Sequence, residues 1–168
     1  VDHMFLDGLE DAYEPGRLMG TFAEDCAEKY QFTREAQDDY ALTSLENSLS
    51  AQKVGAFENE IRTVEVTDRK GAKSLVLFDE QPQNARPDKI PYLKPAFRKN
   101  GTVTPANSSS ISDGAAALIL ASKNYSEKEG LPVRARILGH SSYAHAPGLF
   151  TTAPVYAVKN LLKSIDWS

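Results

Sequence analysis

Two short apolar runs, residues 115–121 and 133–138, most constrain what this chain can fold into. The first contains no charged residue and suits a fully buried strand, whereas the second alternates apolar residues with arginine. A helix is predicted after each run, so residues 101–168 alternate strand and helix in the manner of α/β proteins. Because two strands do not form a stable sheet by themselves, we expect partner strands from elsewhere and a chain that is an internal piece of a longer protein.

The two helices expected in this half have clear end signals. The first covers residues 123–129 and ends at Gly130. The second runs from Thr152 to Ile165 and has Pro154 in its first turn, where a missing N–H costs nothing. The buried stripe predicted for it consists of Val155, Val158, Leu161, Leu162 and Ile165.

The chain before residue 101 is predicted to be rich in helix. Thr21 and Glu24 fit a capping box, so we expect a helix that starts at Thr21 and ends near Tyr30. Thr33 is the expected N-cap of a longer helix over residues 34–54. The buried stripe predicted for this longer helix consists of Ala41, Leu45 and Leu49.

A β-hairpin is expected next. Residues 61–66 and 74–78 are rich in β-branched and apolar residues, and a polar turn separates them. Four prolines between residues 81 and 95 remove backbone donors and predict an irregular connector. The predicted fold class is therefore α/β and incomplete, with a helix-rich domain carrying a hairpin over residues 1–100 and a partial αβ layer over residues 101–168.

Composition argues against several kinds of partner. The net charge is −4, and no run of Lys and Arg exceeds two residues, so no nucleic-acid partner is expected. No apolar stretch approaches the length of a membrane span, and the three histidines lack zinc-ligand spacing, so we expect neither a membrane nor a metal. Cys26 is the only cysteine, which suits a reducing compartment, and the expected location is cytoplasmic.

The most informative stretch runs from Gly101 to Ala117, where small hydroxyl residues and the amide of Asn107 precede the first apolar run. Short side chains let a ligand approach the backbone, and hydroxyl groups can bond amide or phosphate groups. The same residues also suit a polar loop of turn-forming residues, and composition alone favours that plainer reading.

The order of residues in this stretch resembles the thiolase family, whose signature G-T-V-T-x-x-N-x-S-x-x-x-D-G-A-A-A fits residues 101–117 with Asp113 as its aspartate. Further segments similar to thiolases follow in order along nearly the whole chain: Asp7–Ala12, Met19–Glu24, Thr33–Asp38, Ala51–Ile61, Leu93–Phe97 and Ala153–Val158. The resemblance is to the loop domain that covers coenzyme A, plus the start of the C-terminal half, of an acetyl-CoA acetyltransferase-like member.

The resemblance implies a reaction and a division of labour. Thiolases are acyltransferases that make or cleave 3-ketoacyl-CoA through a cysteine thioester, with coenzyme A as a substrate and no separate cofactor. A second cysteine and a histidine transfer protons in the family, and the motifs that hold all these groups do not occur in this chain. We therefore expect no catalytic residue here and no activity from the 168 residues alone. The parent protein is expected to form dimers or tetramers.

Five residues are expected, by the resemblance, to contact the substrate. Ser109 would bond the pantetheine arm of coenzyme A, and the pantetheine and acyl tunnel would be lined by Leu9, Met19, Phe97 and Pro105. Ordinary packing is the alternative role for each. Cys26 lies inside a predicted helix with no histidine near it in sequence, so we expect a packed thiol and not a nucleophile.

Two departures from the family pattern and two other functions complete the predictions. Leu18 replaces a histidine common before Met19, and Gln83 stands where a basic residue often meets the adenine end of coenzyme A. The chain could instead be a non-catalytic CoA-binding or oligomerisation module. It could also belong to a condensing enzyme of the same fold, although those enzymes lack the signature as it stands here.

Overall fold

A computed structural model describes residues 2–112 and 114–167 and contains two compact units. The first unit comprises the residues up to Cys26 together with those from Ser110 onward, and the second comprises Ala27–Ser109. One boundary falls inside helix α1 (Met19–Tyr30), and the other follows residues 101–109, which we call the signature loop. The predicted boundary at residue 100 separates two parts of the family fold, not two compact units of this chain, and it stays a prediction.

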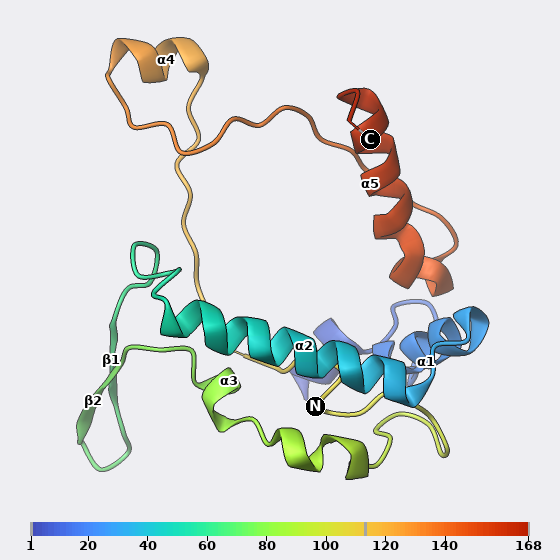
Figure 1. Ribbon diagram of the computed structural model, residues 1–168. Helices are drawn as coiled ribbons and strands as arrows, with labels where there is room; N and C mark the ends of the chain where they lie inside the picture. The colour runs from blue at the N-terminus through green and yellow to red at the C-terminus, as the bar shows by residue number, and fades with distance from the viewer. Residues whose placement is uncertain (1, 113, 168) are drawn as a thin grey trace. The chain divides into compact units, whose positions relative to one another are not determined.

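The longest helix of the second unit is α2 (Arg34–Lys53), drawn in Figure 1. Thr33 caps it as predicted, because its Oγ1 accepts a hydrogen bond of 3.1 Å from the amide of Ala36. The helix stops before Gly55, which takes a left-handed φ of +66°. The predicted burial of its stripe was wrong: Leu49 is 39% exposed, while Ala41 and Leu45 are only half-buried.

The proline-rich connector is more regular than predicted. It contains the short helix α3 (Glu80–Asn84) and a 3₁₀ helix, η2 (Pro87–Tyr92), both of which contact α2. Pro82 and Pro87 stand in the first turns of α3 and η2, where a missing N–H breaks no intrahelical hydrogen bond, while Pro91 lies inside η2 and Pro95 follows it. Ile90 of η2 is only 6% exposed and is the buried residue of this connector.

The predicted hairpin is confirmed. Strands β1 (Val64–Thr67) and β2 (Lys73–Val76) pair antiparallel with Val64 opposite Val76. The turn between them is set by Asp68, whose Oδ1 accepts hydrogen bonds from the amides of Lys70 and Ala72, both at 2.8 Å. Every residue of the two strands is exposed.

The first unit contains a π-helical turn, η1 (Phe5–Leu9), the start of α1, the short helix α4 (Lys123–Lys128), a 3₁₀ helix, η3 (Pro147–Thr152), and α5 (Ala153–Ser164). The end signals at Gly130 and Pro154 are confirmed. The stripe predicted for α5 is only partly covered, since Val155 and Val158 are 51% and 53% exposed.

The capping box predicted for α1 was wrong. The helix begins at Met19, two residues before the predicted N-cap. Thr21 lies inside the first turn, and its Oγ1 donates a hydrogen bond of 2.8 Å back to the carbonyl of Leu18. Threonine can form either bond with nearby backbone, and here the backward bond prevails over capping. The predicted end near Tyr30 is confirmed.

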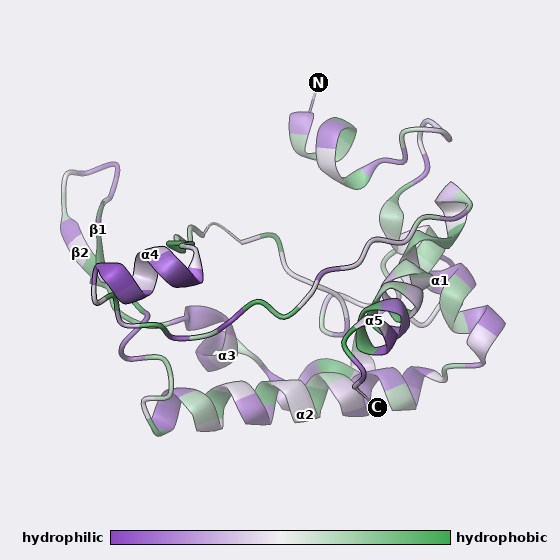
Figure 2. Cartoon of the chain, turned by 90° about the horizontal axis from the view of Figure 1, so that it is seen from above, coloured by the Kyte–Doolittle hydropathy of each residue, from purple (hydrophilic) through white to green (hydrophobic). Residues whose placement is uncertain are grey.

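The two predicted strands at 115–121 and 133–138, and with them the partial αβ layer, do not form within the described residues. Both segments run as extended coil (Figure 1), and Figure 2 shows hydrophobic stretches along this part of the chain. Ile119 is 95% exposed and Ile137 is 72% exposed. A strand needs a neighbouring strand to pair with its backbone N–H and C=O groups. Neither segment has such a neighbour among the residues that the structure describes.

The core of the first unit centres on Phe22, which is 2% exposed. The ring of Phe150 meets it edge-to-face with centroids 5.6 Å apart, and the guanidinium of Arg17 lies 3.7 Å from its centroid. A Cβ added at Gly148 would lie 3.4 Å from this ring, so the chain of η3 passes close to it. Among the described helices, none combines the length and apolarity needed to cross a membrane.

Candidate functional site

The signature loop is closed on itself by the amide side chain of Asn107. Its Oδ1 accepts a hydrogen bond of 2.7 Å from the amide of Thr104, and its Nδ2 donates one of 3.0 Å to the carbonyl of Thr102. Ser108 adds a third link, because its Oγ donates to the carbonyl of Thr104 at 2.7 Å. Thr104 is 0% exposed, so this loop is built around a buried residue and is not a loose polar turn.

Helix α2 holds the loop from one side. The Nδ2 of Asn107 also donates to Oδ1 of Asp38 at 3.0 Å, and Gln37 Nε2 donates to Oγ1 of Thr102 at 2.9 Å. Asp38 is only 6% exposed, although aspartate is almost never fully buried unless it is paired. Two successive helix residues thus fix one side of the loop that carries the thiolase-like signature.

Arg34 links this helix to the chain that leads into the loop. Its Nε donates to Oδ2 of Asp38 at 2.7 Å, while its Nη1 and Nη2 donate to the carbonyls of Leu93 and Ile90 at 3.0 and 2.8 Å. Sequence reasoning missed the role of these residues. The available signal was the i,i+4 spacing of Arg34 and Asp38 on one helix face, but nothing in the sequence placed Leu93 or Asn107 beside them.

Three of the five predicted site residues lie in the second unit on this framework. Phe97 is half-buried, whereas Pro105 and Ser109 are exposed. The amide of Ala96 donates to the carbonyl of Val103 at 2.9 Å, which joins the segment that carries Phe97 to the signature loop. The structure therefore places these three residues on one continuous, hydrogen-bonded piece of backbone.

The other two predicted residues lie in the first unit, beside an isolated antiparallel bridge. The bridge pairs Glu10 with Leu18, so that Leu9, the last residue of η1, and Met19, the first residue of α1, each adjoin a bridged residue. The chain turns between them at Gly16, which has φ of +83°. Leu9 is half-buried and Met19 is 41% exposed.

Arg17 secures this turn to α1. It donates to Glu14 at 2.9 and 2.8 Å and pairs with Asp25 at 2.5 Å. The hydrogen bond to Glu14, followed by the nearby negative charges of Glu14 and Asp25, raises the pKa of Arg17 above its ordinary value. The permanent charge of Arg17 therefore ties the segment before Met19 to the helix that follows it.

Other chemistry-bearing residues have ordinary partners. Cys26 is half-buried in α1, as expected for a packed thiol. Gln83, which the resemblance predicts to lie near the adenine end of coenzyme A, donates to Oε1 of Gln52 in α2 at 3.4 Å. The described His, Cys, Asp and Glu side chains form no group that could hold a metal ion. Asp113 of the signature lies outside the described residues.

The family described as "Thiolase, N-terminal domain" matches residues 1–124. The chain belongs to the thiolase family. The predicted resemblance is thus confirmed. The chain is 46% identical to a probable acetyl-CoA acetyltransferase of Dictyostelium discoideum over 98% of its own length and 39% of that thiolase. It is 48% identical to acetyl-CoA acetyltransferase 2 of Arabidopsis thaliana over 94% of its own length and 40% of that relative.

Solved thiolase structures agree with this assignment. The Acat5 thiolase of Ascaris suum, determined in complex with coenzyme A, superposes with a TM-score of 0.90 at 38% identity. That comparison covers 100% of this chain and 42% of the Ascaris thiolase. Human mitochondrial 3-ketoacyl-CoA thiolase gives a TM-score of 0.89 at 33% identity. The chain therefore spans about two fifths of the length of the thiolases it matches.

Proposed function

We propose that the full-length protein is an acetyl-CoA acetyltransferase that makes or cleaves 3-ketoacyl-CoA through a cysteine thioester, and that this chain supplies residues that bind coenzyme A. The observation that carries the proposal is the state of Ser109, which is exposed at the end of a loop whose other hydroxyl groups are engaged. Thr102, Thr104 and Ser108 each take part in hydrogen bonds inside the second unit. Ser109 is thus the hydroxyl placed to meet a ligand.

The chemistry of coenzyme A suits this loop. Its pantetheine arm carries two amide groups, and a serine hydroxyl can donate to or accept from an amide. Pro105 and the half-buried Phe97 would offer apolar surface to the methylene groups of the same arm. These residues bind and orient, while bond-making needs a nucleophile from the rest of the thiolase, since positioning contributes only when the reacting group is present.

Three finer proposals accompany this function. The segments 115–121 and 133–138 become strands of an α/β layer when the remaining three fifths of the thiolase provide their neighbours. The full-length protein forms dimers or tetramers, in keeping with its family. Its location is cytoplasmic, a proposal that rests only on the single cysteine, Cys26.

The first test compares the full-length protein with the 168-residue chain in the thiolysis of acetoacetyl-CoA. We expect turnover from the full-length protein and none from the chain, because the chain lacks the cysteine and histidine motifs of the family. Thiolysis by the pure chain contradicts the proposed division of labour. A full-length protein that binds coenzyme A without turnover supports the alternative of a non-catalytic CoA-binding module.

The second test replaces Ser109 with alanine in the full-length protein. Loss of one hydrogen bond to a neutral amide should raise the KM for coenzyme A by about 3- to 10-fold, with little change in kcat. Steady-state thiolysis at varied coenzyme A measures both constants. Ser110→Ala is the matched control, because Ser110 is also exposed but bonds its neighbour Ser112. Equal KM values for the two variants contradict the assignment of Ser109.

A further inference from the structure

We propose that Asp38 is a positioning residue for coenzyme A: it holds Asn107 in place and thereby fixes where the signature loop presents Ser109. The inference rests on the proposed function and assigns to α2 a role in substrate binding. Asp38 itself is 6% exposed and accepts a hydrogen bond from Asn107 of the loop. It would act on the substrate through the loop and not by contact.

First, the two carboxylate oxygens of Asp38 have different partners. Oδ2 accepts from Arg34 at 2.7 Å and Oδ1 accepts from Asn107 at 3.0 Å. Both partners are donors, and only an ionised carboxylate offers an acceptor to each of them. An asparagine at position 38 would turn an N–H group towards one of these donors. The position therefore demands a charged acceptor, which is unusual at so low an exposure.

The orientation of the Asn107 amide carries the second step. Its two N–H donors are directed to Asp38 and to the carbonyl of Thr102, and its oxygen accepts from the amide of Thr104. A flipped amide would place its oxygen against the carboxylate of Asp38 and its N–H group against the amide of Thr104. Asp38 thus selects one orientation, and with it the closed form of the loop.

The third step connects this closed form to the substrate. Asn107 precedes Ser109 by two residues, and between them Ser108 is fixed to the carbonyl of Thr104 at 2.7 Å. The backbone that carries Ser109 therefore continues directly from the segment that Asp38 holds. A binding group must stay within a fraction of an ångström of its productive place, so a loosened Asn107 would weaken the bond that Ser109 makes.

The experiment uses the full-length protein with Asp38→Asn, and with Asp39→Asn as the matched control on the same helix, where Asp39 is exposed. The KM for coenzyme A and kcat are measured in thiolysis, and the Kd for coenzyme A is measured by calorimetry. We expect Asp38→Asn to raise KM and Kd about tenfold, the effect of one charge-assisted hydrogen bond, with kcat per folded enzyme within about twofold. Asp39→Asn should leave all three unchanged.

A double variant separates positioning from general support of the fold. Asp38→Asn combined with Asn107→Asp exchanges donor and acceptor between the two residues and restores one hydrogen bond between them. It should bind coenzyme A more tightly than Asp38→Asn but less tightly than the unaltered protein, because a carboxylate at position 107 can no longer donate to the carbonyl of Thr102. A purely structural role would instead lower the amount of folded enzyme and leave KM and Kd unchanged in Asp38→Asn.

The outcomes distinguish this inference from the proposed function. If the unaltered protein binds coenzyme A and Asp38→Asn leaves Kd and KM unchanged, the positioning role is wrong while the proposed function stands. If the unaltered protein binds coenzyme A without turnover, the enzyme proposal fails and the ratio of Kd values still decides the role of Asp38. Absence of coenzyme A binding by the unaltered protein overturns both.

Discussion

Replacing Phe22 with alanine should lower the free energy of local unfolding in the first unit by about 3–5 kcal/mol, the usual effect of removing a buried aromatic ring. Phe22 is 2% exposed, and the substitution removes the edge-to-face contact with Phe150 and the overlying charge of Arg17. Hydrogen exchange of the amides of α1 and η3 in the full-length protein measures this loss, as a rise in exchange rate of roughly a hundredfold or more.

Phe32→Ala is the control for this substitution. It removes the same ring from a site that is 53% exposed, where the main contact is a stack on Tyr30. Its expected cost is below about 1 kcal/mol, in line with exposed substitutions and a single aromatic pair. If the two alanine variants exchange equally fast in α1, Phe22 is not the centre of the first unit.

The second large effect is expected from Arg34→Ala. This substitution leaves the carboxylate of Asp38 buried without its cation and removes the donor from the carbonyls of Leu93 and Ile90. Breaking one side of a buried ion pair costs about 3–5 kcal/mol. The connector that contains η2 should therefore open more often, and trypsin should cleave the full-length protein after Lys89 roughly a hundredfold faster.

Two further variants make the test specific. Arg34→Lys keeps the charge but cannot reach three acceptors with one ammonium group, so its cleavage rate should lie between those of the alanine variant and the unaltered protein. Arg62→Ala removes an arginine that also bonds backbone carbonyls, but from an exposed site. Its effect should stay within about 0.5 kcal/mol. An Arg34→Ala protein as resistant as Arg62→Ala contradicts the role given to Arg34.

Local signals in the sequence were sufficient where local chemistry decides the structure. The cap at Thr33, the hairpin turn at Asp68 and the position of Pro154 each depend on neighbours within a few residues, and each prediction is confirmed. The prediction that Thr21 caps a helix was wrong for a related reason. Its hydroxyl had two local backbone partners, and the capping pattern does not say which one prevails.

Features that depend on distant residues were beyond the sequence. The strands expected at 115–121 and 133–138 are defined by partners, and the described part of the chain provides none. The contacts of the candidate site could not be predicted for the same reason. Gln37 and Asp38 looked like part of a family pattern, yet their use became visible only when the fold placed them against Thr102 and Asn107.

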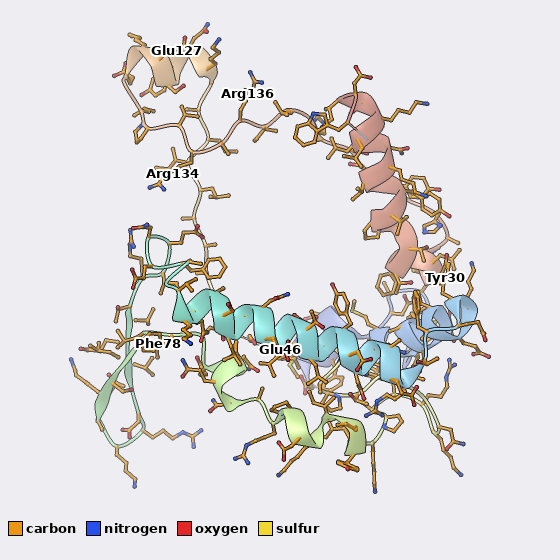
Figure 3. All side chains as sticks on the ribbon, in the orientation of Figure 1. Tyr30, Glu46, Phe78, Glu127, Arg134 and Arg136 are labelled. Atoms are coloured by element: carbon orange, nitrogen blue, oxygen red, sulfur yellow. The ribbon has the colours of Figure 1, made fainter. Side chains whose placement is uncertain are left out.

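The two extended segments, 115–121 and 133–138, also differ in their tendency to aggregate before the protein is fully folded. The first, with Leu118 and Ile119 90% and 95% exposed, has neither charge nor proline and resembles the short sequences that stack into amyloid-like sheets. The second carries Arg134 and Arg136, seen in Figure 3 on the chain between α4 and α5, and such charges act as gatekeepers against edge-to-edge stacking. Self-association of partly folded chains should therefore nucleate at 115–121. A chaperone that binds exposed apolar segments should bind the partly folded chain there.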